Sequence, residues 1–93
     1  LPGDALPLAV DELHRVLEAT LAVAVLQQVL AGFADGRLTP EPGLDLFGEP
    51  GTEQGARRAL ERTLRDLART ESDHAVRIGL VDQANTVRPR TLW

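Results

Sequence analysis

The 93-residue sequence contains no cysteine, no lysine, no methionine and no tyrosine. Without cysteine the chain can form no disulfide, no thiolate zinc site and no thiol nucleophile. Without lysine it has neither a phosphate-binding loop of the Gly-Lys-Ser/Thr kind nor a Schiff-base residue. These absences remove most kinds of catalytic site, so we predict that this chain is not an enzyme by itself and binds no cofactor.

Few other side chains are suited to catalysis or metal binding. His14 and His74 lie 60 positions apart, and neither has a neighbouring set of ligands, so we predict no metal site. Ser72 precedes a predicted helix and is better explained as its cap than as a nucleophile activated by His74. We therefore predict no catalytic residue in this chain.

Aromatic residues make up 3% of the chain and hydrophobic residues 43%, which describes one small domain with a limited core. We expect packing against further protein to stabilise it. The sequence starts with Leu1 and lacks methionine, so we expect a piece of a longer protein. No basic segment precedes an apolar one at the N-terminus, and we expect a cytoplasmic location.

All ten basic residues are arginine, which is typical of a GC-rich coding sequence and suggests a high-GC bacterium. The net charge of −4 is unevenly distributed. Residues 1–55 carry two arginines against nine carboxylates, a charge of −7, while residues 56–93 carry eight arginines against five carboxylates, a charge of +3. Such halves can attract each other within the fold, attract other copies, or mark a charged partner.

The spacing of apolar residues predicts a first helix from about residue 9 to residue 34, entered through Pro7. Leu13, Leu17 and Leu21 follow the spacing of one helical face. From residue 19 onward the helix is apolar nearly all round, and a helix without a polar face must be surrounded. Two glutamines interrupt this run, so we interpret it as a buried helix that needs a protein neighbour, with no membrane span.

Residues 35–52 are rich in glycine and proline and are predicted to be an ordered loop, held on the helices by Leu44, Leu46 and Phe47. A second helix is expected over residues 53–70 after the cap Thr52, and a third over residues 73–87 after the cap Ser72. Residues 88–93 form a C-terminal tail after Pro89 stops the helix. No strand is predicted, so the fold class is all-α, as a single helical domain over residues 1–93.

Four arginines on the second helix are spaced 4, 3 and 4 apart and share about a quarter of its circumference. This arginine stripe consists of Arg58, Arg62, Arg65 and Arg69. It is typical either of a phosphate-binding surface or of the solvated back of an amphipathic helix with i,i+4 ion pairs. We favour the solvated surface, because the chain is acidic overall and no aromatic residues interleave with the arginines, and we expect no nucleic-acid partner.

The second and third helices, joined by a short turn, look like one tetratricopeptide repeat, with Leu64 in the first helix, Ala84 late in the second and Pro89 just after it. The fold is therefore expected to consist of antiparallel helical hairpins of the tetratricopeptide-repeat type. A repeat unit of this kind cannot bury its apolar face alone and needs neighbours.

The last sixteen residues resemble the extreme C-terminus of actinobacterial serine/threonine protein kinases of the protein kinase G type, whose last helix reads close to L-V-D-x-A-N-x-V-R-P. The matching positions here are Asp82, Ala84, Asn85, Val87, Arg88 and Pro89. The resemblance implies a non-catalytic tetratricopeptide-repeat domain at the end of a signalling kinase, used for self-association and for placing the kinase relative to partners. It implies that the catalytic residues of the kinase lie outside this chain.

We therefore predict a protein-interaction module that binds the rest of a longer chain, a second copy, or both. The expected contacts lie on the apolar first helix and in the loop: Leu21, Val25, Val29, Phe33, Leu44, Leu46 and Phe47. The alternative is an independent helical dimer or adaptor with no kinase attached.

Overall fold

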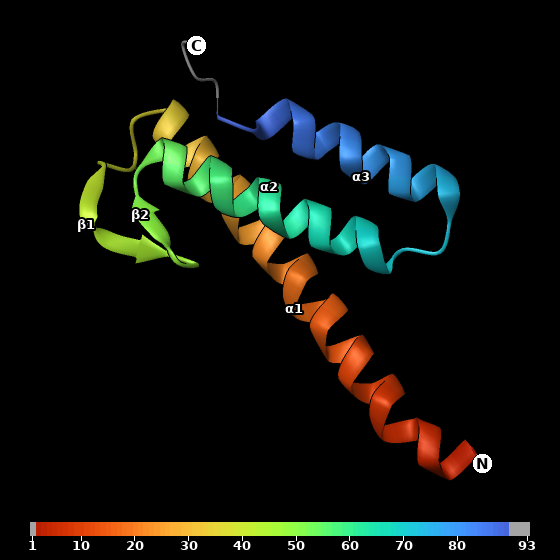
Figure 1. Cartoon of the computed structure of the whole chain (residues 1–93). Coiled ribbons are helices and arrows are strands. Elements are labelled where there is room, and N and C mark those ends of the chain that lie inside the picture. Colours follow the sequence, from red (N-terminus) through yellow and green to blue (C-terminus); the bar gives the residue numbers. More distant parts are fainter. Residues whose placement is uncertain (1, 90–93) are drawn as a thin grey trace.

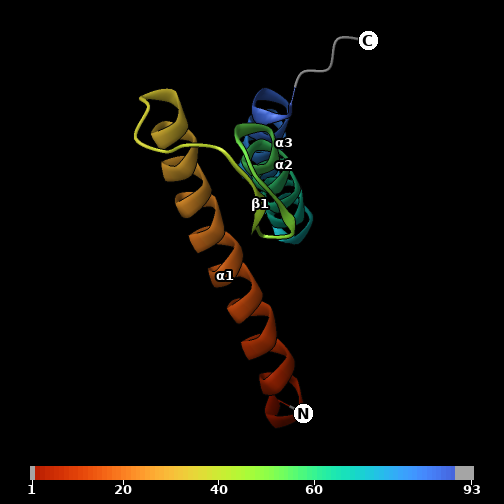
Figure 2. The same ribbon diagram turned by 90° about the vertical axis from the view of Figure 1, so that its left-hand side faces the viewer.

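The computed structural model describes the backbone of residues 2–89 and the side chains of residues 10–89 other than 42, 44 and 46. The order of elements is α1 (Pro2–Ala34), β1 (Glu41–Leu46), β2 (Glu49–Gly51), α2 (Glu53–Thr70) and α3 (His74–Val87). Helices dominate the chain, which confirms the all-α class. As Figures 1 and 2 show, α2 and α3 run side by side, whereas α1 crosses α2 and its N-terminal half extends away from the other two helices.

Helix α1 begins at Pro2, seven residues before the predicted start, so the expectation that the chain enters this helix through Pro7 is wrong. Proline is tolerated in a first turn because the N–H groups there have no partner within the helix. Pro2 occupies the first helical position, where this applies, whereas Pro7 is the sixth residue of α1 and removes one internal hydrogen bond, to the carbonyl of Gly3.

Helix α1 ends at Ala34, where the sequence predicts, and the glycine that follows explains why. Gly36 has φ +82°, a left-handed conformation common after helix ends. Its N–H donates to the carbonyl of Phe33, and the N–H of Leu38 donates to the carbonyl of Gly32 at 3.1 Å. These bonds satisfy carbonyl groups that the end of a helix would otherwise leave unpaired.

The segment predicted as an ordered loop contains a β-hairpin, so the expectation of no strand is wrong. Strands β1 and β2 pair antiparallel, with Asp45 opposite Pro50 and Leu46 opposite Glu49, and an irregularity separates these pairs from the pair formed by Glu41 and Gly51. The connecting residues Phe47 and Gly48 both have positive φ, of 52° and 86°. Two-residue turns of this kind favour Asn-Gly, and phenylalanine there gives no turn signal in the sequence.

The caps of α2 and α3 show one correct and one incorrect prediction. Thr52 caps α2 as expected, because its Oγ1 accepts a hydrogen bond from the N–H of Gly55 at 3.1 Å. Helix α3 is capped by Asp73 instead of Ser72, since the Asp73 carboxylate accepts from the N–H of Val76 at 3.1 Å. The side chain of an N-cap residue accepts a hydrogen bond from the N–H of the second or third helical residue. Ser72 lies one residue too early in the chain to accept this bond.

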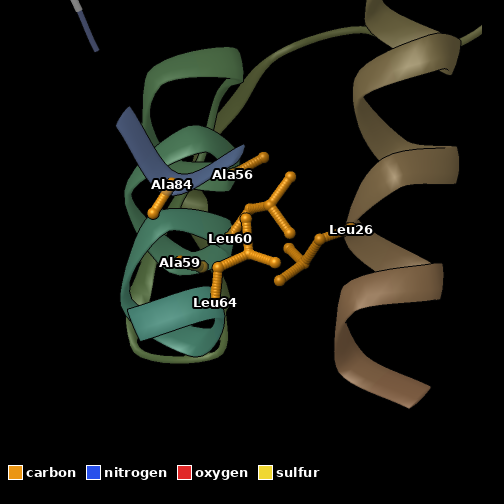
Figure 3. Close-up of a cluster of buried hydrophobic side chains, with 6 residues drawn as sticks. All are labelled: Leu26, Ala56, Ala59, Leu60, Leu64 and Ala84. Atoms are coloured by element: carbon orange, nitrogen blue, oxygen red, sulfur yellow. The ribbon is translucent and has the colours of Figure 1, made fainter. Parts of the chain in front are cut away.

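Helix α2 provides the centre of the core, as Figure 3 shows. Leu60 and Leu64 point from α2 toward Leu26 of α1, while Ala84 of α3 packs on the other side of α2. Ala56 and Ala59 complete the buried cluster, and Val23, Val29, Leu30, Phe33, Leu80 and Val87 pack around it half-buried. The small alanine side chains allow the helices to approach closely, but they also limit how much apolar area the core removes from water.

Candidate interaction surface

The structure separates the predicted contact residues into two groups. Leu21 is 67% exposed, and Val25 and Phe47 are also exposed, at 48% and 50%. Val29 and Phe33 instead pack against the core of this chain. The side chains of Leu44 and Leu46 lie outside the described residues.

Helix α1 carries a line of exposed apolar residues that is longer than the sequence prediction. We call it the α1 stripe, and its members, each between 48% and 67% exposed, are Val10, Leu13, Leu17, Leu21 and Val25. Leu17 and the fully buried Leu26 are nine residues apart, which at 3.6 residues per turn places them on opposite sides of the helix. Helix α1 therefore has one apolar face in the core and a second, unpartnered one on its back. The spacing of Leu13, Leu17 and Leu21 signals that second face in the sequence, but the spacing alone does not tell which face packs on α2.

The helix that the sequence analysis predicts to be buried is largely uncovered by the rest of this chain. Within Val10–Ala34 an 18-residue window has a mean hydropathy of 1.7, and only 11% of that window is buried in the fold. By length and composition alone the segment could cross a membrane, a test that core helices of water-soluble proteins and signal sequences also pass. Its C-terminal half contributes Leu26 to the contact with α2, however, so in this fold α1 is part of a packed helical core.

An open groove with a volume of about 700 Å³ lies where α1 diverges from α2. Val16 and Ala19 line it from α1, and Leu67 lines it from α2. Phe47 also lines it, and its backbone carbonyl accepts a hydrogen bond from Nη2 of Arg62 at 2.5 Å. A non-glycine residue with positive φ is strained, and asparagine or glycine would form this turn at lower cost. The groove thus presents an aromatic ring that the hairpin itself does not require.

Carboxylates of this chain pair with every member of the arginine stripe. Arg58 and Arg62 both bind Glu49 of β2, at 3.2 Å each. Arg65 binds Glu61 at 2.7 Å, with i,i+4 spacing, and Arg69 binds Asp66, with i,i+3 spacing. The stripe therefore holds the hairpin on α2. The sequence could not reveal this role, because Glu49 lies in the segment predicted as a loop.

The residues of the C-terminal motif attach α3 to α2. Ala84 is fully buried, and Val87 packs beside it. The Asn85 Oδ1 accepts from Nη2 of Arg65 at 3.0 Å, and the carbonyl of Val87 accepts from Nη1 of Arg57 at 3.4 Å. Within the helix end, the Arg88 N–H donates to the Ala84 carbonyl and the Asp82 carbonyl accepts from Thr86, while Pro89 lies just beyond, half-buried. Contacts between α2 and α3 thus account for three of the motif positions, namely Ala84, Asn85 and Val87.

The charged groups of the described residues show little that is typical of a reaction site. No group of three or more histidine, aspartate or glutamate residues is arranged there to hold a metal ion. Asp35 is the described residue with a shifted pKa, which hydrogen bonds from the side chain and backbone of Arg37 lower below the ordinary value of 3.8. That pair lies exposed just beyond the end of α1. The features that remain as candidates are apolar surfaces, namely the α1 stripe and the groove beside Phe47.

Comparison with known proteins gives a family for this chain. A family model described as protein kinase G tetratricopeptide repeat matches residues 5–91. A curated relative, the serine/threonine-protein kinase PknG of Mycolicibacterium smegmatis, is 37% identical over 90 residues, which are 97% of this chain. The chain spans 11% of the length of that relative. No solved structure matches this chain. With nearly the whole chain matched by the model, it belongs to the protein kinase G tetratricopeptide-repeat family.

Proposed function

We propose that this chain is the non-catalytic, C-terminal tetratricopeptide-repeat module of a cytoplasmic serine/threonine protein kinase, and that it binds protein partners and associates with itself. Membership of the repeat family supports the interaction role, since repeats of this type bury their apolar faces against neighbours. The relative, a kinase about nine times as long as the matched segment, supports the connection to a kinase.

One observation carries the proposal, namely the five-residue α1 stripe with side chains about half or more exposed. A contiguous row of valine and leucine across four turns of helix exceeds the scattered single apolar residues that are normal on a protein surface. Fully burying an exposed side chain of this kind contributes roughly 1.5 to 3 kcal/mol, and about half of that remains to be gained at each half-exposed position of the row, so a partner that covers all five gains several kcal/mol.

Self-association is tested by sedimentation velocity of the isolated chain between micromolar and millimolar concentrations. We expect the weight-average mass to rise with concentration. A Phe47→Asp variant, which places a charge beside the groove, should lower the mass if a second copy occupies the groove. A Leu21→Asp variant, which places a charge in the α1 stripe, and the exposed control Glu53→Gln should then leave the mass unchanged. A mass equal to one chain at every concentration contradicts self-association.

The connection to a kinase is tested by identifying the polypeptide that carries this sequence in cell extract, with an antibody to the purified chain and mass spectrometry of the captured band. We expect peptides of a kinase catalytic domain on the same polypeptide. A full-length polypeptide without them would favour an independent adaptor or dimer.

A further inference from the structure

We infer that the α1 stripe is the docking site of a basic amphipathic helix from another protein segment, which packs along the back of α1 antiparallel or parallel to it. The inference deepens the proposed interaction function and rests on it. The occupant is defined by its chemistry: a row of apolar side chains at helical spacing, with lysine or arginine beside that row.

The shape of the surface favours a helix as the occupant. Val10, Leu13, Leu17 and Leu21 follow one another at spacings of 3, 4 and 4, which forms a straight ridge of the kind that packs into the groove of a second helix. The N-terminal half of α1, which bears most of this ridge, extends away from α2 and α3, as both views show (Figures 1 and 2). A partner helix can therefore lie along it without meeting the rest of the fold.

The charges beside the stripe favour a basic occupant. Asp11 and Glu18 are seven residues apart, so they lie on the same flank of the stripe, and both are exposed. Among the described residues neither takes part in an ion pair. The one arginine of this part of the helix, Arg15, lies beside Asp11 and Glu18, but its guanidinium is bound to Glu12 at 2.6 Å. The flank thus offers two free carboxylates to the partner.

A second copy of the chain does not supply the matching charge. In an antiparallel pair related by a two-fold axis, equal flanks meet, so Glu18 of one copy would lie beside Glu18 of the other. In a parallel pair the acidic flank would meet the side of Thr20 and Gln27, which carries no cation. Like charges across an interface oppose association, so the charges beside the stripe favour a partner other than a second copy. We therefore place self-association at the groove beside Phe47.

The same flank argues against a membrane surface as the occupant. Helices that lie on membranes carry lysine and arginine on their polar face, which attract anionic lipids. Asp11 and Glu18 would be repelled by such lipids. A basic helix therefore matches both the apolar ridge and its charges, whereas an anionic bilayer matches only the ridge.

The test uses two fluorescent synthetic peptides of 18 residues that differ only in charge. Both carry leucine at spacings of 3, 4 and 4; one has lysine at the flanking positions and the other glutamate. Binding to the purified chain is measured by fluorescence anisotropy at 50 mM and 500 mM salt. One exposed ion pair changes affinity by roughly 1.5- to 5-fold, so two pairs predict that the lysine peptide binds roughly 2- to 30-fold more tightly, with the difference shrinking at high salt.

Three variants test the residues that carry the inference. Leu17→Asp places a charge in the middle of the ridge and should weaken the lysine peptide about tenfold or more. The double variant Asp11→Lys and Glu18→Lys should invert the preference between the peptides. Glu53→Gln, at the start of α2, is the control and should change neither affinity. All substituted positions are exposed, so circular dichroism should show unchanged helix content.

Four results would overturn the inference: no binding of either peptide, equal binding of both, a double variant that keeps the wild-type preference, or cosedimentation of the purified chain with vesicles of phosphatidylcholine and phosphatidylserine. Sedimentation velocity of the Leu17→Asp variant distinguishes failure of this inference from failure of the proposed function. If Leu17→Asp still self-associates while it loses the peptide, the inference stands. If Leu17→Asp abolishes self-association, the second copy occupies the stripe, and the inference fails while the proposed function survives.

Discussion

Two leucines of α1 provide the sharpest test of how this helix is oriented. Leu26 is 0% exposed and contacts the core leucines of α2, whereas Leu21 is 67% exposed on the back of the same helix. Leu26→Ala removes buried methyl groups and leaves a cavity, which costs about 2 to 5 kcal/mol. Leu21→Ala removes a side chain that water already contacts, so its cost should stay within about 0.5 kcal/mol.

The size of the first effect is large for a chain of this length. Domains are stable by roughly 0.05 to 0.15 kcal/mol per residue, which is about 5 to 14 kcal/mol here. A loss of about 3 kcal/mol is therefore a substantial part of the total, and it should lower Tm by roughly 12 to 24 °C. The small core gives this site few neighbouring large side chains with which to fill the cavity, so little recovery by relaxation is expected.

Urea unfolding followed by circular dichroism at 222 nm measures both variants, at several protein concentrations. If Leu21→Ala lowered the free energy of unfolding as much as Leu26→Ala at every protein concentration, the orientation of α1 would be refuted. A cost that grows with protein concentration has a different meaning, since it shows that a second copy covers Leu21. A cost below 1 kcal/mol for Leu26→Ala would also refute the packing of α1 on α2.

Three further predictions concern other elements. Gly55→Ala should lower the free energy of unfolding by about 1 to 3 kcal/mol, because the added Cβ would lie 1.9 Å from a carbonyl oxygen of β2. Gly79→Ala, in open space within α3, should raise it by about 0.5 to 1 kcal/mol. Equal effects of the two variants in urea unfolding would contradict the packing of the hairpin on α2. Asp73→Ala should cost about 1 kcal/mol as the loss of a helix cap, and Ser72→Ala almost nothing, so the opposite order in the same assay would assign the cap to the serine. The pKa of the Asp35 carboxyl, measured by NMR, should lie below 3.8. Because its folded pKa is lowered, its contribution to stability is present above pH 3.8 and is lost as the pH falls through the folded pKa. Arg37→Ala should return the pKa of Asp35 to its ordinary value.

The positions of the helices could be predicted from local features of the sequence. The apolar spacing on α2 and its cap Thr52 are properties of neighbouring residues, and the structure places them as expected. The sequence places the start of α1 too late because proline is usual at the beginning of a helix and disfavoured in its interior, whereas Pro7 lies in the second turn. The cap of α3 was missed by one residue, because Ser72 and Asp73 are both good caps and the sequence does not choose between them.

The hairpin shows where local signals fail. Its turn contains Phe47 in a conformation that phenylalanine rarely adopts, so no pattern announces it. Contacts distant in sequence hold it instead: Glu49 binds Arg58 and Arg62, and the β2 carbonyl of Pro50 lies against Gly55. The arginines were visible as a stripe, but their partner could be found only once the chain was folded.

Because α1 has two apolar faces, its sequence indicates that further protein should cover it but does not indicate which face the partner covers. A helix that is apolar nearly all round has no polar face to indicate which side is covered. Leu60 and Leu64 of α2 cover the side of Leu26, and the opposite side, with Leu17 and Leu21, is left to water. Because the core contains so few large side chains, covering that second face would add apolar contact comparable to the contact α1 already makes within the fold. The partner on the back of α1 is therefore expected to affect the stability of this domain as well as its position relative to other proteins.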